Sequence, residues 1–272
     1  MTDKASAPSN ACDRPSAPRD HQGRVLANEK ISSNFWLLRL EVPDFPPARP
    51  GQFVQFQCRR TELDQPFLRR PFSIMDRDGD RLDFVYKSIG PGTRFLERLG
   101  TGDTLALLGP LGEGFRLDLT SSDNVLTVAG GTGLGGVLYW IKEVARRGIS
   151  QRFIFGVRRR EELPVRFLAD LPVELEAVVE DEDGFVTPRL EALAPGYFTR
   201  AAVCGPTPMM RAVAEALTPR VERVELSLEE MMGCGFGICY TCPVRAADRD
   251  DYYYSACVDG PVFAAERIIL GG

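Results

Sequence analysis

The sequence predicts a multi-domain protein with a small antiparallel β-barrel first, an α/β domain with a parallel sheet second, and a short cysteine-rich segment last. Three observations support this prediction. Short strand-like runs separated by turns fill residues 23–120, strands alternate with helices over 121–225, and four cysteines lie close together within 226–272. Residues 1–22, which are rich in Ser, Ala, Pro and Asp, are expected to form a disordered tail.

The barrel prediction rests on runs of β-branched and aromatic residues, for example at 35–40, 53–56 and 82–86. Pro, Gly and Asp residues separate these runs and supply the turns, as at 78–80. Many short strands joined by regular turns are typical of a small barrel or sandwich. One helix is expected over residues 94–99, after a glycine-rich turn.

The α/β prediction begins with a buried-type strand at 125–129, followed by a glycine run and an amphipathic helix that Gly148 is expected to terminate. Apolar residues recur along this helix at helical spacing, namely Leu134, Val137, Leu138, Ile141 and Val144. A helix at 207–217 that begins at a proline follows the last of three further strands, expected at 152–157, 176–179 and 201–204. This alternation predicts a parallel sheet.

Composition and charge exclude several classes of function. The 272 residues carry a net charge of −5, without the clustered basic residues that nucleic acids or anionic membranes require. The apolar runs are shorter than the ~18 residues of a membrane span and no signal peptide is visible, so a cytoplasmic protein is expected. Because His21 is the single histidine, neither a histidine-activated nucleophile nor histidine-ligated zinc is expected. A protein whose bound cofactor carries the reactive chemistry would be consistent with this lack of histidines.

Four cysteines near the C-terminus follow the spacing C-x4-C-x2-C-x14-C, namely Cys234, Cys239, Cys242 and Cys257. This is the plant-type spacing of a [2Fe–2S] cluster, in which each iron takes two thiolates and one tight loop supplies three of the four. Glycines at 233, 235 and 237 allow the loop to direct backbone N–H groups at the sulfurs. Structural zinc is the alternative, although zinc ribbons usually present two C-x2-C pairs and this chain has one.

Two features of the barrel could hold the phosphates of a flavin dinucleotide. The first is Arg69-Arg70-Pro71-Phe72-Ser73, where an arginine at a strand end can hold a pyrophosphate and the serine hydroxyl can reach a ring nitrogen. The second is Gly90-Pro91-Gly92-Thr93, which opens a helix with free N–H groups. A solvated arginine pair before an edge strand is the alternative interpretation.

The α/β domain carries a nucleotide-binding motif. Gly131-Thr132-Gly133-Leu134-Gly135-Gly136 matches G-x-G-x-x-G between a predicted strand and a predicted helix. The acidic residue usual at the end of the next strand is replaced by arginines at 158–160, which are either a solvated face or a site for a 2′-phosphate, so NADP stays open beside NAD. Cys204-Gly205-Pro206 follows the last expected strand, where Cys204 either faces a nicotinamide or packs as a small buried side chain.

Taken in order, these motifs resemble the ferredoxin–NADP reductase family: R-P-x-S, G-x-G-T, G-G-T-G-x-G and C-G-P-x-P-M. The cysteine loop and the run C-V-D-G-P-V-F at 257–263 narrow the resemblance to the electron-transfer subunits of class 1B dihydroorotate dehydrogenase. The resemblance implies that FAD is bound by Arg70, Pro71, Phe72, Ser73, Val85, Tyr86, Lys87, Gly92 and Thr93. It also implies iron ligation by the four cysteines, no catalytic residue in this chain, and NAD binding by Gly130, Gly131, Thr132, Gly133, Cys204, Gly205 and Pro206.

The family implies an electron-transfer function in pyrimidine (UMP) biosynthesis. A separate FMN-containing subunit would oxidise dihydroorotate, and electrons would pass through the [2Fe–2S] cluster and FAD to NAD⁺, in a heterotetramer with two copies of each subunit. The second hypothesis is a reductase of the same architecture that serves an oxygenase, a hydrogenase or a glutamate-synthase-like enzyme. The third is a non-catalytic, zinc-stabilised nucleotide-binding module. Residues 243–245 and 248–254 depart from the family pattern near the cluster, which leaves the docking partner open.

Overall fold

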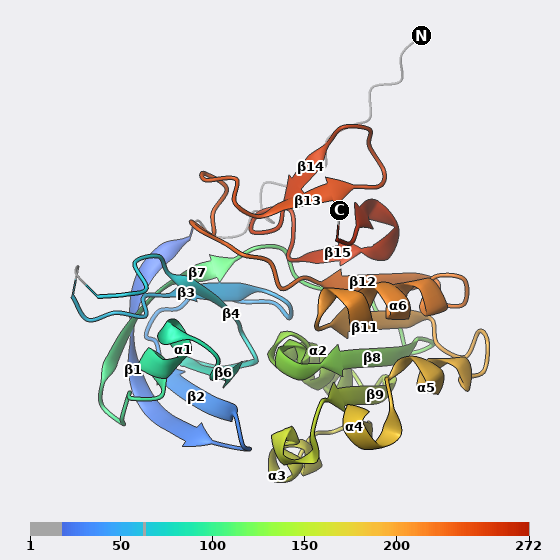
Figure 1. Cartoon of the computed structure of the whole chain (residues 1–272), viewed down its shortest axis with the longest axis horizontal. Helices are drawn as coiled ribbons and strands as arrows, with labels where there is room; N and C mark the ends of the chain where they lie inside the picture. Colours follow the sequence, from blue (N-terminus) through green and yellow to red (C-terminus); the bar gives the residue numbers. More distant parts are fainter. Residues whose placement is uncertain (1–17, 62–63, 272) are drawn as a thin grey trace.

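The computed structural model describes residues 18–61 and 64–271 as three parts packed against one another (Figure 1). A curled β-sheet lies beside an α/β domain, and the C-terminal segment runs across one end of both. The cofactor motifs found in the sequence therefore come from parts of the chain that meet in space.

The barrel is a seven-stranded antiparallel sheet in the order β4-β3-β7-β1-β2-β6-β5. Its strands, with the helix α1 (Pro91–Leu96) after the sixth, are β1 (Arg19–Lys30), β2 (Phe35–Glu41), β3 (Phe53–Phe56), β4 (Arg70–Ser73), β5 (Asp76–Asp78), β6 (Arg81–Lys87) and β7 (Thr104–Leu111). Aromatic and aliphatic side chains fill the concave face, where the ring centroids of Phe56 and Phe84 lie 4.8 Å apart. The curled antiparallel sheet confirms the predicted all-β first domain.

The start of the barrel differs from the sequence prediction. Residues 1–17 of the expected tail lie outside the described residues, but β1 begins at Arg19 and so includes the last four positions of that tail. These polar residues form a strand because β7 supplies their backbone partners, beginning with Gly109 opposite Arg19. Pairing with a distant strand has overridden a local composition that is typical of disorder.

The second domain has a parallel sheet in the order β10-β9-β8-β11-β12, to which β15 (Val262–Ala264) adds an antiparallel edge strand. The parallel strands are β8 (Asn124–Gly130), β9 (Ser150–Val157), β10 (Glu174–Val179), β11 (Arg200–Cys204) and β12 (Arg223–Ser227). The predicted α/β class is confirmed. Two details differ from the sequence prediction. The strand β11 is not the last parallel strand, and β12 continues past residue 225, where the α/β domain was expected to end.

Helices cover both faces of this sheet. They are α2 (Leu134–Arg146), α3 (Val165–Ala169), α4 (Glu180–Asp183), α5 (Thr187–Glu191) and α6 (Thr207–Leu217), with 3₁₀ turns η1 (Gly131–Gly133), η2 (Arg160–Glu162) and, near the C-terminus, η3 (Ala265–Arg267). The predicted end of α2 is confirmed, because Gly148 follows it with φ +67°, in the left-handed region that favours glycine. Among the described residues, no helix is long and apolar enough to cross a membrane.

The C-terminal segment does not fold apart from the other two domains. Its small antiparallel sheet consists of β13 (Pro243–Ala246), β14 (Tyr253–Ser255) and β16 (Ile268–Ile269), while β15 joins the α/β domain. Ala264 of β15 pairs with Glu225 of β12, and Glu113 N of the barrel donates to Gly260 O at 2.5 Å. These bonds anchor the segment to both preceding domains, as its small size requires.

The barrel and the α/β domain are joined by an ion-pair cluster around Asp76, which is 6% exposed. Lys142 Nζ lies 2.5 Å from Asp76 Oδ2, and Arg146 Nη2 lies 3.3 Å from Asp76 Oδ1. On the same helix, the Tyr139 hydroxyl donates to Ala48 O at 3.1 Å. Helix α2 is therefore fastened to the barrel, and the cavities between the two domains have fixed walls.

Candidate functional site

A cavity of about 480 Å³ lies between the barrel, the glycine-rich loop and the residues that lead into the cysteine loop; we call it the flavin cavity. The structure places on it every residue that the sequence resemblance suggested for FAD, namely Arg70, Pro71, Phe72, Ser73, Val85, Tyr86, Lys87, Gly92 and Thr93. Its opposite wall comes from Thr132 and Gly135 of the α/β domain and from residues 228–232. Motifs that are distant in the sequence thus share one cavity.

The two arginines before Pro71 have different roles. Arg69 Nη2 lies 2.6 Å from Asp20 Oδ1, so its charge is neutralised within the barrel. Arg70 lines the cavity, and its Nη1 donates to Leu68 O at 2.9 Å and to Arg69 O at 3.1 Å. Within the described residues it has no carboxylate partner. Arg70 is therefore held in place by carbonyl groups while its positive charge stays available to an anion.

The turn before α1 is arranged around Thr93. Its Oγ1 accepts hydrogen bonds from the N–H groups of Ile89 and Gly90, both at 3.0 Å. Gly92 packs directly under Arg70, because a Cβ atom at this glycine would lie 3.3 Å from Arg70 Cγ. The absence of a side chain at Gly92 lets the arginine stem lie flat on the turn.

Hydrogen bonds on the side away from the flavin cavity hold the Tyr86 side chain in place. Its hydroxyl donates to Asn28 Oδ1 at 3.1 Å, and Asn28 Nδ2 in turn donates to Leu96 O at 2.8 Å. Burial raises the pKa of the Tyr86 hydroxyl above its ordinary value, so the ring stays neutral. The Tyr86 side chain thus links β6 to the end of α1 and gives the cavity a rigid wall.

A second cavity of about 480 Å³ lies at the carboxyl ends of the parallel strands; we call it the nucleotide cavity. Of the residues suggested for NAD, the structure places Gly130, Gly131 and Pro206 on its wall, whereas Thr132 lines the flavin cavity. Arg158 and Glu180, at the ends of β9 and β10, complete the site. Glu180 is absent from the sequence analysis, although its place after a parallel strand is a usable signal.

The remaining residues suggested for NAD, namely Gly133, Cys204 and Gly205, pack against one another beneath the glycine-rich loop and do not line the nucleotide cavity. A Cβ atom at Gly133 would clash with the carbonyl of Cys204, and one at Gly205 would lie 2.8 Å from Met209 Cε. Cys204 itself is 2% exposed, and a Cβ at Gly136 would lie 2.7 Å from its Sγ. Burial raises the pKa of the Cys204 thiol, so it is a neutral packing group. This position fits the interpretation of Cys204 as a small buried side chain.

The flavin and nucleotide cavities meet at Lys87, which lines both. Its Nζ lies 2.9 Å from Glu162 Oε2, and the Glu162 side chain is 5% exposed. On the wall of the flavin cavity, Thr132 Oγ1 donates to Glu229 Oε2 at 2.8 Å. No local sequence pattern indicates Glu162 or Glu229, because the two pairs join residues 75 and 97 positions apart.

The cysteine loop surrounds its sulfur atoms with hydrogen-bond donors. Cys234 Sγ accepts from the N–H groups of Phe236 at 3.5 Å and Ile238 at 3.3 Å, and Cys239 Sγ accepts from Cys234 N at 3.3 Å. Hydrogen bonds, first from the Thr241 side chain and then from backbone groups, lower the pKa of Cys239 to about 6. Donors aimed at sulfur stabilise thiolate ligands, so this loop is suited to a cluster.

The other two cysteines, Cys242 and Cys257, are each 2% exposed, and burial first and then the neighbouring Cys242 thiol raise the pKa of Cys257. The four cysteines thus form two pairs, one towards the surface and one inside. Within residues 18–61 and 64–271, no group of three His, Cys, Asp or Glu side chains is close enough to hold a single metal ion. Two pairs of thiols are what a two-iron cluster needs, with two thiolates for each iron.

A buried carboxamide lies below this loop. Gln55 on β3 is completely buried, and neither its Oε1 nor its Nε2 has a hydrogen-bond partner among the described residues. A Cβ atom at Gly235 would lie 2.6 Å from Gln55 Nε2, so the amide packs against the cysteine loop. Buried amides without partners are costly, and this one has donors to offer to a group held by the loop. No sequence motif points to it.

These sites define a class of protein. A curled barrel with an R-P-F-S strand, a parallel-sheet domain with a glycine-rich loop and a four-cysteine segment together characterise the iron–sulfur members of the ferredoxin reductase-like electron-transfer proteins. The comparisons with known proteins narrow this class. Residues 229–269 match the family model described as the iron-sulfur cluster binding domain of dihydroorotate dehydrogenase B.

Two relatives extend the match over nearly the whole chain, and both are named dihydroorotate dehydrogenase B (NAD(+)), electron transfer subunit. The one from Caldanaerobacter subterraneus is 32% identical over 252 residues, covering 92% of this chain and 98% of the relative. The one from a Geobacillus species is 35% identical over 260 residues, covering 93% and 99%. The chain belongs to the family of dihydroorotate dehydrogenase B electron transfer subunits and is an oxidoreductase subunit.

Solved structures agree with the fold. The structure of an NADH-dependent reduced ferredoxin-NADP oxidoreductase aligns with a TM-score of 0.77 and 25% identity, covering 91% of this chain and 90% of that one. A ferredoxin NADP⁺ reductase from Neisseria gonorrhoeae, solved with bound FAD and NADP, aligns with a TM-score of 0.59 and 18% identity, covering 74% and 91%. The second likeness concerns the fold alone.

Proposed function

We propose that this chain receives electrons from the FMN of a partner subunit that oxidises dihydroorotate, and delivers them through a [2Fe–2S] cluster and FAD to NAD⁺. This reaction belongs to pyrimidine biosynthesis, in a cytoplasmic complex with two copies of each subunit. One observation carries the proposal: the flavin cavity touches both other sites. Met232, two residues before Cys234, lines it on one side, and Lys87 joins it to the nucleotide cavity on the other.

The order of the sites matches the chemistry of the cofactors. When bound, a [2Fe–2S] cluster moves single electrons, whereas a flavin exchanges electrons singly or in pairs and can therefore serve NAD⁺, which takes a pair. In the chain, Arg70 would neutralise the flavin pyrophosphate and Ser73 would offer its hydroxyl to the ring. Lys87, held by Glu162, would orient the groups that meet at the boundary of the two cavities.

This chain needs no general base for the substrate, and the proton that FAD would take up with its two electrons, before a hydride passes to NAD⁺, can come from solvent. His21 lies on β1 and lines neither the flavin cavity nor the nucleotide cavity. Burial lowers the pKa of His21, which keeps it neutral. A chain without substrate chemistry of its own fits this arrangement, with the substrate proton removed in the partner subunit.

The surface around the cysteine loop supports docking of that partner. Several apolar side chains on the loop are exposed, namely Met231, Phe236, Ile238, Tyr240 and Val258, with Met231 82% exposed. Exposed apolar patches of this kind mark interaction sites. A partner seated here would cover the outer cysteine pair and bring its own cofactor close to the cluster.

The proposal is tested by anaerobic purification, absorption spectroscopy and reconstitution. The protein alone is expected to show both flavin and iron–sulfur bands, and the complex with the FMN subunit is expected to reduce NAD⁺ with dihydroorotate. A colourless protein that contains zinc would contradict the redox assignment. A cofactor-replete complex that fails with dihydroorotate would point instead to another redox partner for the same architecture.

The separation of the two cofactor sites gives a second test. The substitution Cys242→Ser removes one buried thiol and is expected to abolish the cluster bands while the flavin stays bound, because no cysteine of the loop lines the flavin cavity. Cys204→Ala is the matched control, since it removes a buried thiol outside the loop. Loss of both cofactors in Cys242→Ser alone would show that the sites are not separate.

A further inference from the structure

Thr241 places a side-chain hydroxyl beside a sulfur of the cysteine loop. Its Oγ1 lies 3.2 Å from Cys239 Sγ and accepts a hydrogen bond from Gly233 N at 2.8 Å. We propose that Thr241 is a positioning residue for electron transfer, whose hydroxyl donates to the Cys239 sulfur and raises the reduction potential of the cluster. This inference rests on the proposed function, in which the loop holds a [2Fe–2S] cluster.

The direction of this hydrogen bond follows from the number of protons available. A threonine hydroxyl has one proton to donate and two lone pairs that accept. Gly233 N already donates to Thr241 Oγ1, so the oxygen is the acceptor in that bond. A cysteine that binds a metal is a thiolate without a proton, so the Cys239 sulfur can only accept. The proton of the Thr241 hydroxyl is therefore directed at Cys239 when the loop holds its metal.

The backbone of the loop fixes the position of this hydroxyl. A Cβ atom at Gly233 would lie 3.0 Å from Thr241 Oγ1 and 3.1 Å from Cys239 Sγ, so the hydroxyl and the sulfur approach the same glycine. Thr241 is an exposed residue and adds little to the packing of the loop. Its β-branched side chain also has few rotamers, which holds the oxygen in one place. These contacts are those of a polar group directed at the sulfur.

The hydrogen bond lies where electrons are proposed to enter. Cys239 is exposed, whereas Cys242 and Cys257 are buried, so its sulfur faces the surface on which the partner is proposed to dock. This sulfur also accepts a bond from Cys234 N at 3.3 Å, and the Thr241 hydroxyl adds a second donor. Donors at ligand sulfurs stabilise the additional negative charge of a reduced cluster and raise its potential. Thr241 thus favours acceptance of an electron from the partner.

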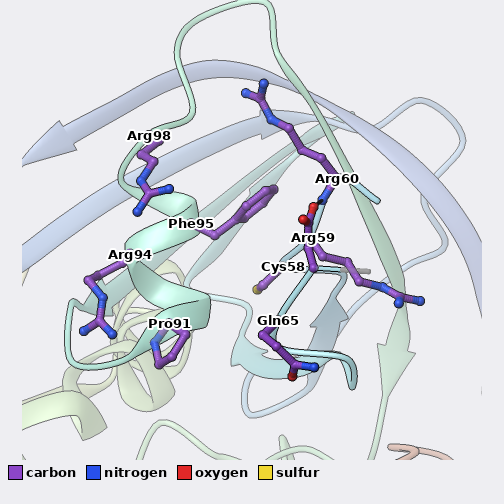
Figure 2. Close-up of a pocket in the computed structure, with 9 residues that line it drawn as sticks. Cys58, Arg59, Arg60, Gln65, Pro91, Arg94, Phe95 and Arg98 are labelled. Carbon is purple, nitrogen blue, oxygen red and sulfur yellow. Dashed lines mark hydrogen bonds between the residues drawn. The ribbon is translucent and has the colours of Figure 1, made fainter. Parts of the chain in front are cut away.

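A cysteine outside the loop has the opposite arrangement. Cys58 lies on the wall of a cavity beside α1, where it is 1% exposed (Figure 2). Its thiol donates to Phe56 O at 3.8 Å, so here the sulfur gives its proton to a carbonyl group. The two donors at Cys239 are therefore a feature of the cysteine loop and not of every cysteine in this fold.

The test is a redox titration, followed by EPR, of the full chain purified anaerobically with its cofactors. Thr241→Val removes the hydroxyl and keeps the shape of the side chain. At a fixed potential it is expected to lower the ratio of reduced to oxidised cluster about tenfold, a shift of about 59 mV to more negative values for one electron. Thr241→Ser keeps the hydroxyl and is expected to keep the potential of the parent.

Thr218→Val is the matched control. Thr218 is also exposed, but its hydroxyl donates to Ala214 O at 2.7 Å on α6, and its replacement is expected to leave the potential unchanged. Resonance Raman spectra give a second measurement. Transfer to D₂O is expected to shift the iron–sulfur stretching bands of the parent and of Thr241→Ser, and to shift those of Thr241→Val by less.

Two results would overturn the proposal directly: equal potentials in Thr241→Val and the parent, or a shift in Thr241→Ser as large as that in Thr241→Val. If Thr241→Val assembles no cluster, Thr241→Ala replaces it, and loss of the cluster in both variants would show that Thr241 acts in assembly and not on the potential. A parent protein without a [2Fe–2S] cluster would contradict the proposed function itself, a result distinct from any difference among the Thr241 variants.

Discussion

Gln55 packs its carboxamide directly beneath the backbone of Gly235, the residue that follows the first cysteine of the cluster loop; a Cβ atom at Gly235 would lie 2.6 Å from Gln55 Nε2. On β3, Gln55 is paired with Pro71 of β4, and Pro71 lines the flavin cavity. Gln55 therefore contacts the cysteine loop through its side chain and pairs through its strand with a residue on the wall of the flavin cavity.

The first prediction concerns the unused donors of Gln55. Hydrogen bonds near an iron–sulfur cluster raise its reduction potential because they stabilise the more negative reduced form. Replacing Gln55 by Leu is expected to shift the cluster midpoint potential to more negative values, measured by a redox titration followed by EPR. The thermal midpoint of the cluster-free protein is expected to stay the same or rise, because there the amide has no partners and its burial costs about 1–3 kcal/mol.

Gln52 provides a matched control for this substitution. It is buried like Gln55, but its Oε1 accepts from Arg49 N at 2.8 Å and its Nε2 donates to Gly112 O at 2.8 Å. Gln52→Leu is therefore expected to lower stability by about 1–3 kcal/mol and to leave the potential unchanged. Equal potentials in Gln55→Leu and the parent would disprove a role of Gln55 at the cluster.

The second prediction concerns Gly235, whose φ of +84° lies in the left-handed region. Gly235→Ala adds backbone strain of about 1–2 kcal/mol and a clash with the Gln55 amide, so the cluster is expected to be lost or bound weakly. Gly102→Ala is the control for strain alone, because Gly102 has φ +93° and no atom within 4 Å of the added Cβ. If the clash with Gln55 causes the loss, the double variant Gly235→Ala with Gln55→Ala is expected to recover part of the cluster absorption. Additive losses of cluster in the two single variants and the double variant would contradict this explanation.

Much of this arrangement could be predicted from the sequence, because the flavin and cysteine motifs are local. Arg70 and Thr93 each belong to a short motif that predicts a strand end or a turn. In the structure both residues line the flavin cavity. Gln55 could not be predicted, since a buried glutamine in an apolar strand has no motif. Its importance depends on Gly235, which is 180 positions away and reaches β3 only after three domains have packed.

The antiparallel strand β15 was missed for a related reason. Residues 262–264 follow the last cysteine, and a run of three residues is too short to specify a strand or the sheet that it joins. Phe263 is paired with Leu226 of β12, so the partner was decided by where the cysteine loop ends in space. Strand partners of this kind depend on tertiary contacts more than on local propensity.

The third prediction concerns the ion pair between Lys87 and Glu162. The Lys87 side chain is 21% exposed and that of Glu162 only 5%, so Glu162→Gln leaves a partly buried ammonium without its partner. We expect a loss of about 2 kcal/mol in unfolding free energy, below the 3–5 kcal/mol of fully buried pairs, because water still reaches Lys87. Since Lys87 lines the nucleotide cavity, KM for NAD⁺ is also expected to rise.

Glu41→Gln is the control for this ion pair. Glu41 forms an exposed pair with Arg24, in which the side chains are 42% and 53% exposed, and its loss is expected to cost less than about 1 kcal/mol without any effect on KM. Urea unfolding and steady-state kinetics measure both quantities. Identical behaviour of the two variants would mean that the buried pair has no special role at the boundary.

The last prediction concerns Glu225 on β12, which is 7% exposed. Burial raises the pKa of its carboxyl group from 4.5 to about 7, although Arg116 N donates to Oε1 at 3.3 Å and the charges of Arg223 and Arg116 act in the opposite direction. A raised folded-state pKa means that the native protein holds the proton more tightly than the unfolded chain. The resulting stability is complete below about pH 4.5 and is lost as the pH rises through about 7.

The substitution Glu225→Gln removes this dependence, because the amide accepts the same hydrogen bond and never ionises. At pH 8 the variant is expected to be more stable than the parent by up to about 3 kcal/mol, from 1.36 kcal/mol for each pKa unit, with little difference at pH 4.5. Glu215→Gln, at an exposed position on α6, removes the same charge and is expected to give no such gain. Urea unfolding between pH 4.5 and 8 measures the profiles, and parallel curves for Glu225→Gln and the parent would show that the proton on Glu225 does not contribute to stability.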